Sequence, residues 1–357
     1  MEMALAFAET TSASRDQRAV TLLECTLRDG SYAVDYAFTA EETARVAKAL
    51  ESAGVRLIEI GHGLGLGASE SGHGIAAASD QDYCAAVDAA LTDALWGVFF
   101  IPGIGNPERL AQAIDAGLGF VRIGSNITEL AGQAPYIAQA KVAGLLTFSN
   151  LMKSYVVRPA EFARHAAEAQ AMGADIVVLV DSAGGMMPRE IAAYVEATLE
   201  RAPDLRVGFH GHNNLGLANA NALAAAEAGA VIVDATLNGL GRSAGNAITE
   251  SLVLILQQAG FATGIDSLGI QDIGKQFIQP YLQHRGGIDP LDLTVGAARF
   301  HSSYLGQLKE VAAEFGLDLR ALVLAVGALN LEQPTRAVMR EVAGRLSAQA
   351  YPIRLEI

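Results

Sequence analysis

Eight short apolar runs alternate with longer Ala-rich stretches between residue 20 and about residue 260. We expect the apolar runs to form β-strands, because short apolar runs bounded by turn residues are typical of strands buried on both faces of a sheet. The eight predicted strands are Thr21–Thr26, Val55–Ile60, Trp96–Ile101, Phe120–Gly124, Leu145–Leu151, Ile176–Asp181, Arg206–His210 and Val231–Thr236.

The stretches between these runs predict helices, and several of them begin with a proline or follow a capping residue, as in Asn106-Pro107. They include Ala40–Ser52, Asp80–Leu91, Pro107–Ala116, Pro159–Met172, Pro188–Leu199 and Leu217–Ala228. Strands that alternate with helices predict parallel βαβ units, and eight such units favour a closed (β/α)8 TIM barrel in an α/β protein. An open doubly wound sheet is the alternative, but no GxGxxG turn follows the first strand.

From about Asp266 the pattern changes, and helix-like segments dominate the rest of the chain. The predicted helices there are Ile270–Tyr281, Ala298–Phe315, Leu319–Val326 and Gln333–Gln349. We therefore expect three parts: a frayed tail at 1–19, a catalytic barrel at 20–265, and a helical C-terminal appendage at 266–357 that packs near the mouth of the barrel.

Composition excludes several classes of partner. A net charge of −14 disfavours binding to nucleic acid or to an anionic membrane surface. No apolar run approaches the roughly 18 residues that a membrane span needs, and Met1 to Phe7 lack the basic start of a secretory signal. Cys25 and Cys84 are the only cysteines and form no CxxC motif, which is typical of a protein of the reducing cytoplasm.

Polar residues follow almost every predicted strand, while the strands themselves are apolar. The reacting groups of a TIM barrel lie at the C-terminal ends of its strands, so we expect an active site there. The residues at these ends are Arg28, Asp29, Glu59, His62, Arg122, Asn126, Lys153, Tyr155, Asp181, Ser182, His210, His212, Asn213, Asp234, Asn238 and Asn246.

The segment Phe209–Asn213 carries the clearest chemistry. His210 and His212 are two residues apart at the end of a strand, so their side chains project from the same face. Two imidazoles can take adjacent positions on a divalent metal ion, and Asp29 offers a carboxylate from the turn after the first strand. Such ligands suit Mn, Mg, Zn or Co, and the sequence does not select one. The alternatives are histidines satisfied in the core or on the surface, and a structural ion pair at Arg28-Asp29.

Taken together, these motifs resemble the metal-dependent TIM-barrel lyases and aldolases, and in particular the 4-hydroxy-2-oxovalerate aldolases. The superfamily includes hydroxymethylglutaryl-CoA lyase, isopropylmalate synthase and the pyruvate carboxyltransferase domains. The resemblance covers nearly the whole chain, including the appendage around Arg299–Tyr304. The motifs that carry it are Thr26–Gly30, Glu59–Gly63, Pro102–Gly105, Asp181–Gly185, His210–Asn214, Asp234–Gly241 and Gly245–Ala247.

The resemblance implies that Asp29, His210 and His212 hold the divalent ion, usually Mn²⁺ in this family, with His210 also close to the substrate. Asn246 matches a position that binds metal in the lyase branch and is a weaker candidate. The metal ion would chelate pyruvate and acidify its methyl group, so that an enolate forms.

The resemblance also implies roles for two further residues. Arg28 would neutralise the charge on the enolate oxygen, and Ser182 would bind the substrate carboxylate. For Arg28, a purely structural salt bridge to Glu59 or Asp181 is the alternative.

The chain departs from the aldolases at the acid–base positions. Tyr32 stands where the aldolases carry a histidine base, and His301 stands where they carry a tyrosine. We hypothesise that Tyr32 and His301 meet at the mouth of the barrel and share proton transfer with exchanged roles. The alternative is that the site handles another substrate and neither residue is a base. Another family histidine is replaced by Tyr155, and the neighbouring Lys153 raises a weaker possibility of Schiff-base chemistry.

The leading functional prediction is aldol cleavage of a 4-hydroxy-2-oxo acid to pyruvate and an aldehyde, or the reverse condensation. The main alternative is a Claisen-type acyl-CoA condensing enzyme or lyase, although Gly239–Ser243 lacks the cysteine of the lyase branch. Carboxyl transfer is disfavoured because Val180 stands where that branch has a modified lysine, and a non-catalytic scaffold is the last alternative. In the aldolases that the chain resembles, the appendage docks an acylating aldehyde dehydrogenase; the changed residues at positions 32 and 301 leave that partnership open here, and a homo-oligomer is open as well.

Overall fold

Eight parallel strands form a closed barrel in the computed structural model, which describes residues 18–282 and 290–348. Each strand pairs with the next, and the first pairs with the last at Thr21 and Ile232. All eight predicted strands are confirmed: β2 (Thr21–Glu24), β3 (Leu57–Ile60), β4 (Leu95–Phe100), β5 (Phe120–Asn126), β6 (Leu146–Met152), β7 (Ile176–Asp181), β8 (Arg206–Gly211) and β9 (Ile232–Ala235).

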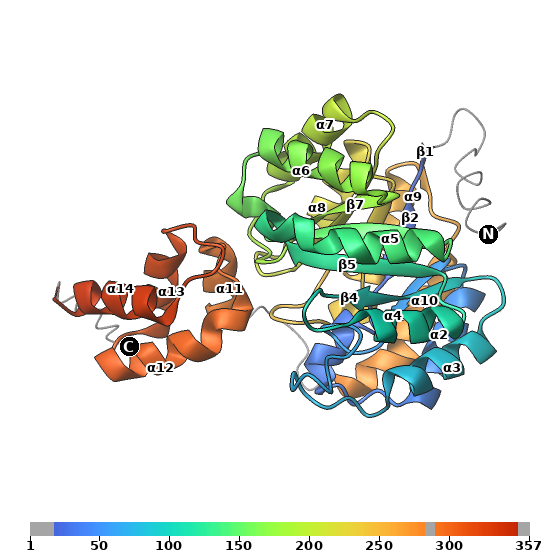
Figure 1. The fold of residues 1–357 in the computed structure, drawn as a ribbon, viewed down its shortest axis with the longest axis horizontal. Coiled ribbons are helices and arrows are strands. Elements are labelled where there is room, and N and C mark those ends of the chain that lie inside the picture. The colour runs from blue at the N-terminus through green and yellow to red at the C-terminus, as the bar shows by residue number, and fades with distance from the viewer. Residues whose placement is uncertain (1–17, 283–289, 349–357) are drawn as a thin grey trace.

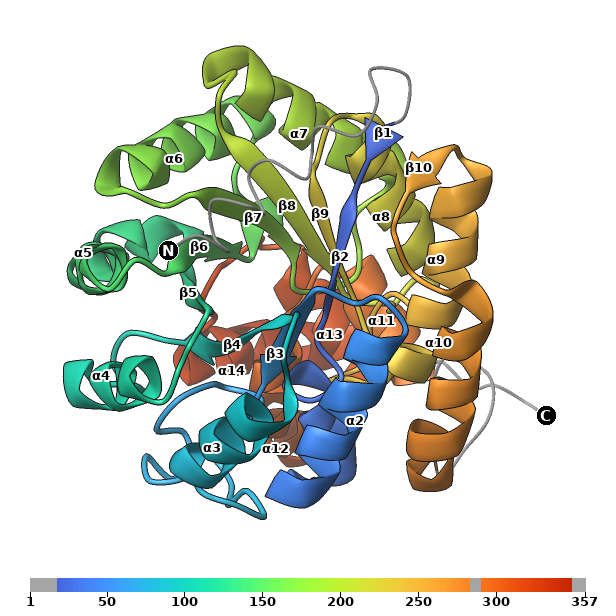
Figure 2. The same cartoon turned by 90° about the vertical axis from the view of Figure 1, so that its right-hand side faces the viewer.

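Helices surround the strands as a ring, which Figure 2 shows. The six predicted helices are confirmed to within two residues at either end, and α5 and α9 complete the ring. The eight are α2 (Ala40–Ser52), α3 (Asp80–Ala90), α4 (Pro107–Asp115), α5 (Ala134–Val142), α6 (Pro159–Met172), α7 (Pro188–Arg201), α8 (Ala218–Glu227) and α9 (Thr249–Gln258).

Local chemistry fixes where these helices begin. The Thr39 side chain accepts from the backbone N–H of Glu42, whose carboxylate in turn accepts from the backbone N–H of Thr39, so α2 starts with a capping box. The Asn106 side chain caps α4 at the N–H of Arg109, and Pro107 occupies the first turn. Each helix therefore starts directly after the loop that follows a strand, and these loops lie together at one end of the barrel.

A short extra ladder lies at the end of the barrel where β2 begins. Strand β1 (Arg18–Ala19) pairs in parallel with β10 (Phe261–Ala262), and the Arg18 guanidinium lies 4.4 Å from the centre of the Phe261 ring. The two residues of β1 fall in the segment that we expected to be frayed, because a two-residue strand leaves no periodic signal in the sequence. The rest of that segment, residues 1–17, lies outside the described residues.

The helical segments after Asp266 divide into two packing environments. Helix α10 (Ser267–Ile273) continues into a π-helical turn (Gly274–Ile278) and a 3-10 turn (Gln279–Tyr281), where we expected one regular helix. Ile270 and Ile278 are buried in the hydrophobic core of the barrel. The first residues that we assigned to the appendage therefore pack with the barrel.

The remaining helices form a second body beside the barrel, visible at the left of Figure 1. These are α11 (Pro290–Ala297), α12 (Leu305–Phe315), α13 (Leu319–Gly327) and α14 (Arg336–Ala348), and they enclose their own hydrophobic core. We call them the C-terminal lobe, together with the segment 298–304. The expected helix Ala298–Phe315 is wrong in its first turns, because Arg299 has a left-handed backbone (φ 50°) that ends α11. Helix α11 was not predicted.

Among the described residues, no helix is long and apolar enough to cross a membrane. Cys25 and Cys84 are both buried and unpaired.

Candidate active site

A cavity of about 200 Å³ opens at the C-terminal ends of the strands, where the barrel faces the C-terminal lobe. Its lining includes residues from both bodies, with Arg28 and His210 from the barrel and His301 from the lobe. Of the residues to which we assigned a metal-binding, substrate-binding or acid–base role, all but Asn246 line the cavity, and Asn246 donates to Asp29, which does. The cavity is therefore where the predicted residues are brought together.

Asp29, His210 and His212 form a buried triad at the floor of this cavity. One ligand atom from each lies within 4.8 Å of the other two, and the Nε2 atom of His210 is 4.0 Å from Oδ2 of Asp29. Asp29 begins the 3-10 helix Asp29–Val34 directly after β2, while the two histidines lie at the end of β8. The alternation of side chains along β8 thus delivers both imidazoles to the same carboxylate.

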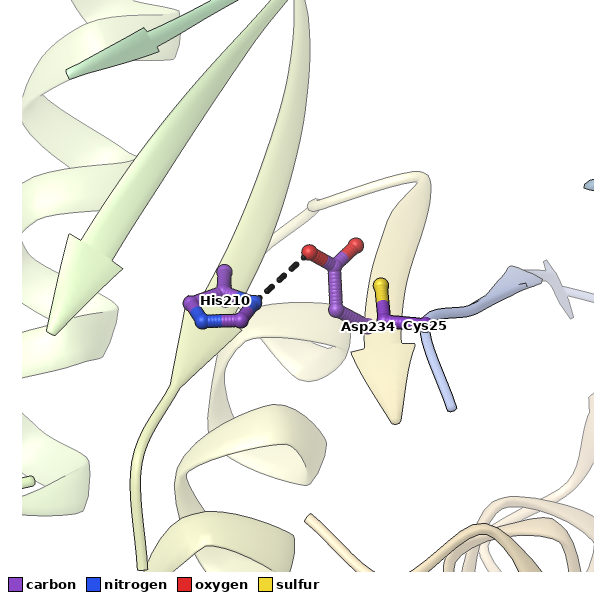
Figure 3. A group of neighbouring side chains, drawn as sticks. All are labelled: Cys25, His210 and Asp234. Atoms are coloured by element: carbon purple, nitrogen blue, oxygen red, sulfur yellow. Dashed lines mark hydrogen bonds and ion pairs between the residues drawn. The ribbon is translucent and has the colours of Figure 1, made fainter. Parts of the chain in front are cut away.

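Hydrogen bonds orient both imidazoles for metal binding. Nδ1 of His210 lies 2.9 Å from Oδ2 of Asp234, as Figure 3 shows, and Nδ1 of His212 lies 3.2 Å from the main-chain oxygen of Gly245. Both partners accept hydrogen bonds, so we assign the proton of each ring to Nδ1, which leaves a lone pair on each Nε2. Burial lowers the pKa of His212 to about 3, so this imidazole is neutral at pH 7.

Asn246 supplies a further oxygen beside the triad. Its amide nitrogen donates to Oδ1 of Asp29 at 2.9 Å and to the main-chain oxygen of Leu240, whereas its Oδ1 atom is buried with no hydrogen-bond partner. A buried amide oxygen without a partner is costly unless a ligand satisfies it. Two neutral imidazoles, a carboxylate and this oxygen fit a divalent cation with mixed nitrogen and oxygen coordination.

Cys25, His210 and Asp234 form a second close group, drawn in Figure 3. Oδ2 of Asp234 pairs with Arg122 and His210, and the Cys25 sulfur lies 3.3 Å from Nη1 of Arg122, whereas Oδ1 of Asp234 is buried without a partner among the described residues. Burial raises the pKa of the Cys25 thiol well above its usual value, so it stays protonated. This group supports His210 from behind and is a poor site for a second ion.

Opposite charges alternate along five side chains around the floor of the site, and the imidazole of His210 closes them into an arrangement that we call the charge ring. Its members in order are Asp29, Arg28, Glu59, Arg122, Asp234 and His210. Oε2 of Glu59 accepts from Nε of Arg28 at 2.8 Å and from Nη1 of Arg122 at 3.0 Å. All six side chains are at least nine-tenths buried, so the five charges among them are stable only because each has two partners in the ring.

The ring fixes the charge states of Asp29 and Arg28. Burial alone would raise the pKa of Asp29, but the charge of Arg28 and the two histidines hold it well below its usual range. Arg28 uses Nη1 for Asp29 and Nε for Glu59, and its guanidinium stacks 4.7 Å from the centre of the Phe99 ring. The salt bridge to Glu59 that we considered for Arg28 is present, and Nη2 has no partner among the described residues.

Ser182 lies at the edge of the same cavity, directly after β7. Its Oγ atom accepts from the main-chain N–H of Lys153 at 2.9 Å, which leaves the hydroxyl hydrogen available to an acceptor in the cavity.

Tyr32 and His301 both line the cavity, but Arg242 lies between them. Nη2 of Arg242 is 2.8 Å from Nε2 of His301, and the guanidinium is 5.3 Å from the centre of the Tyr32 ring. Burial, together with the charges of Arg242 and Lys153, lowers the pKa of His301 well below its usual value. Burial raises the pKa of Tyr32 to about 12, so the phenol is protonated at neutral pH.

Comparison with known families decides the class of the protein. The chain matches the model of the HMGL-like family over residues 19–276. This protein belongs to the HMGL-like family.

Curated relatives of this HMGL-like protein are similar over almost their full length. The 4-hydroxy-2-oxovalerate aldolase 2 of Nocardia farcinica is 38% identical over 340 residues, covering 95% of this chain and 98% of the relative. The 4-hydroxy-2-oxovalerate aldolase of Carboxydothermus hydrogenoformans is 38% identical, covering 92% and 97%. This HMGL-like chain is therefore an enzyme of the lyase class.

Solved structures share the fold of this HMGL-like chain at low identity. The N-terminal domain of a putative aldolase from Bacteroides vulgatus matches with a TM-score of 0.71 at 22% identity, covering 85% of this chain and all of that one. The carboxyl transferase domain of Rhizobium etli pyruvate carboxylase, solved with pyruvate, matches with a TM-score of 0.77 at 18% identity, covering 98% of this chain and 64% of that one.

Sequence reasoning missed two cavity residues of this HMGL-like protein. Arg242 belongs to the loop Gly239–Ser243, which we read only for its lack of a cysteine, and Lys153 was considered only for Schiff-base chemistry. Their signal was present as two basic residues directly after predicted strands. Tyr155, by contrast, is buried beneath the cavity lining, and Phe100 packs in the core against Tyr136 while Phe99 lines the cavity.

Proposed function

We propose that this chain is a divalent-metal-dependent aldolase that cleaves a 4-hydroxy-2-oxo acid into pyruvate and an aldehyde, or joins the two. The observation that carries the proposal is the buried triad of Asp29, His210 and His212, with both Nε2 lone pairs facing a small cavity. A cavity of about 200 Å³ favours a small substrate such as a 4-hydroxy-2-oxo acid over an acyl-CoA. The aldolase names of the relatives support the same reaction.

A metal ion held by Asp29, His210 and His212, with Asn246 as a further ligand, would polarise the 2-oxo group of the substrate and acidify its methyl group. The ligand set accommodates Mn²⁺, which we infer as the resident ion. Neutral imidazoles with their Nδ1 protons held by Asp234 and Gly245 are suited to this role, because the orientation of each ring is set before any ion binds.

The side chains of the cavity then handle the charges of the reaction. Nη2 of Arg28 is free to donate to the 2-oxo oxygen as negative charge develops there, while Glu59 and Asp29 hold the guanidinium in place. The free hydroxyl hydrogen of Ser182 donates to the substrate carboxylate. In cleavage the C3–C4 bond breaks, the 4-hydroxyl loses its proton as the aldehyde forms, and C3 of the pyruvate unit gains a proton.

We assign the proton of the 4-hydroxyl to Nε2 of His301. Its neighbour Arg242 only donates hydrogen bonds, so we assign the lone pair to Nε2. Nδ1 faces two groups of Ser303, the Oγ atom at 2.7 Å and the main-chain N–H at 3.2 Å, and we assign its proton to the contact with Oγ. Tyr32, with its pKa of about 12, is a hydrogen-bond donor and not a base. In this assignment the imidazole of His301 accepts the proton, and the phenol of Tyr32 donates a hydrogen bond.

Two broader features belong to the same proposal. We infer a cytoplasmic enzyme, which two buried and unpaired cysteines support. We also infer an acylating aldehyde dehydrogenase as partner, docked on the C-terminal lobe, because the resemblance to the aldolases implies one. Copurification with such a dehydrogenase is the corresponding test.

The decisive experiment measures exchange of the pyruvate methyl protons in deuterated water by NMR, with the purified chain and Mn²⁺. The proposal expects exchange that chelation of the metal abolishes, and it needs no knowledge of the aldehyde. Asp29→Asn should lose the exchange, whereas Asp35→Asn, an exposed carboxylate six residues along the chain, should keep it. Absence of exchange in the wild-type protein would overturn the proposal.

A further inference from the structure

Two cations line the cavity without a carboxylate in ion-pair contact. Lys153 and Arg242 both reach the lining, and every hydrogen bond that their side chains make among the described residues is to an uncharged partner. Arg28 and Arg122 nearby each contact two carboxylates. In a chain of net charge −14, two buried or half-buried cations left without such partners require an explanation.

Lys153 lines the cavity and has an unfavourable backbone conformation. Its φ is 57°, a left-handed value that a residue with a side chain rarely adopts, and the residue is only 5% exposed. The ammonium donates to Oη of Tyr304 at 3.1 Å and to the main-chain oxygen of Glu332 at 2.9 Å. An ammonium has three donors, so one remains for a ligand.

Arg242 lines the same cavity. The guanidinium contacts Nε2 of His301 and the face of the Tyr32 ring, which together use one of its five N–H donors, and the main-chain N–H of Arg242 donates to Oδ1 of Asp29 at 3.4 Å. Burial lowers the pKa of Lys153 to about 8, the more distant charges of Glu332 and Glu129 oppose this shift, and the positive charge of Arg242 adds to it. The two cations therefore act on each other across the cavity. A bound anion would remove this repulsion and satisfy the free donors.

The position of the pair relative to the triad indicates which part of a substrate it meets. The triad and Ser182 take the 2-oxo acid end at the floor. The side chains of Lys153 and Arg242 extend to Tyr304 and His301 of the C-terminal lobe, whereas their main-chain N–H groups donate to Ser182 and Asp29. The rest of the lining mixes apolar side chains, Phe99, Ile101 and Met152, with the amides of Asn126 and Asn150. The substituent on C4 of the substrate can therefore extend from the triad along this mixed lining to the side chains of the two cations.

We propose that the aldehyde handled by this enzyme carries an anionic terminal group, a carboxylate or a phosphate, which Lys153 and Arg242 bind. The inference rests on the proposed aldolase function and specifies its second substrate. When the anion draws Arg242 away from His301, the Nε2 lone pair becomes free to accept the proton of the 4-hydroxyl. Arg242 thereby couples binding of the anionic group to the availability of the His301 lone pair.

The experiment compares aldol addition of pyruvate to matched aldehydes in the presence of Mn²⁺. Butanal and succinic semialdehyde have the same number of carbons and differ in the terminal carboxylate, and glyceraldehyde and its 3-phosphate form the phosphate pair. We expect kcat/KM for one of the anionic members to exceed that of its neutral partner by about 10- to 100-fold, the usual effect of a charge-assisted contact. The pair with the larger ratio identifies the anion.

Variants test whether these two side chains produce the ratio of kcat/KM between the anionic and the neutral aldehyde. Lys153→Met and Arg242→Gln should each lower it about tenfold or more, whereas Lys153→Arg and Arg242→Lys should retain most of it. Exposed cations changed in the same way, Lys141→Met and Arg320→Gln, serve as controls.

A ratio near one in the wild-type protein would overturn the inference. So would a variant that raises KM for pyruvate equally with both aldehydes, since the cations would then bind the pyruvate carboxylate. Methyl exchange of pyruvate alone, measured on the same samples, separates these outcomes from failure of the aldolase proposal.

Discussion

His210 illustrates how one residue connects the metal site to the interior of the barrel. Its Nε2 atom faces Asp29, while its Nδ1 atom is tied to Asp234, which is itself paired with Arg122. The carboxylate behind the imidazole sets the ring orientation and the tautomer that a metal ligand needs. The affinity of the site for metal therefore depends on a residue that does not touch the metal.

Asp234→Asn tests this dependence. We expect Mn²⁺ affinity to fall about 10- to 100-fold, the usual effect of losing a partner of a metal-binding histidine, as measured by titration followed by electron paramagnetic resonance. Asp115→Asn, at an exposed position on α4, is the matched control. An unchanged affinity in Asp234→Asn would show that the imidazole holds its orientation without the carboxylate.

His301→Ala tests the assigned proton acceptor. We expect turnover in aldol cleavage to fall by a factor of about 100 or more, since a positioned base contributes about 10²–10⁴-fold. The control is His165→Ala on α6, remote from the cavity. Turnover equal to that of the wild type would remove His301 from the mechanism.

At the residue scale, the metal triad could be predicted because its geometry follows from local rules. Two histidines two positions apart on a strand must share a face, and a barrel brings the ends of its first and seventh strands together. The place of Arg242 between Tyr32 and His301 could not be predicted in this way. It depends on the path of an irregular loop and on how the C-terminal lobe docks, and neither has a periodic signal.

Single elements of the barrel are joined by buried polar contacts, and Glu51 at the end of α2 is one of them. Oε1 of Glu51 accepts from three successive main-chain N–H groups, those of Thr92, Asp93 and Ala94, and Oε2 pairs with Lys48. Burial would raise the pKa of Glu51, but these donors lower it to about 2. The ionised carboxylate thereby fixes the loop that leads into β4.

We expect Glu51→Gln to lower the free energy of unfolding by about 1 to 3 kcal/mol at pH 7. Because the pKa is lower in the folded state, this stabilisation is present above about pH 4.5 and is lost as the pH falls towards 2. Urea denaturation at pH 7 and pH 3 should therefore show a difference between wild type and variant that shrinks at the lower pH. Glu41→Gln, exposed in the first turn of α2, should show no such trend.

At the element scale, regular segments could be predicted and their irregular ends could not. The eight strands follow from apolar runs, and Pro107 and Asn106 mark the start of α4 to the residue. The expected helix at 298–315 begins too early because nothing in the local sequence marks the left-handed backbone of Arg299. In that conformation the main-chain N–H groups of Arg299 and Phe300 donate to the oxygens of Gly296 and Val295 and so cap the end of α11, while the Arg299 side chain pairs with Glu190 on α7.

At the scale of the whole molecule, the lobe completes the cavity, so its docking affects the site. Nη2 of Arg299 lies 2.6 and 2.7 Å from the two carboxylate oxygens of Glu190, and Gln333 donates to Glu129 near the end of β5. These contacts are partly exposed, and such pairs are individually weak. The lobe is therefore held by several modest interactions and not by one strong one.

Arg299→Ala should loosen the lobe selectively. We expect faster hydrogen exchange of amides in α11 and α13, with exchange in the barrel strands unchanged, because the two bodies have separate hydrophobic cores. Arg299→Gly also loses the ion pair but tolerates the positive φ, so it should be more stable than Arg299→Ala by about 1 kcal/mol. Equal exchange in α11 and in the strands would contradict independent motion of the lobe.

Closure of the barrel between its first and last strands also constrains how the protein is made. Strand β2 pairs with β9 at Thr21 and Ile232, and β1 pairs with β10, which is synthesised later than β9. At the usual synthesis rate of about 5–20 residues per second, β2 leaves the ribosome roughly 10 to 40 s before its second neighbour exists. During that interval one edge of an apolar strand is open to pairing with other chains. The yield of this enzyme in a cell should therefore depend on translation speed and on chaperones that cover the nascent N-terminal strands.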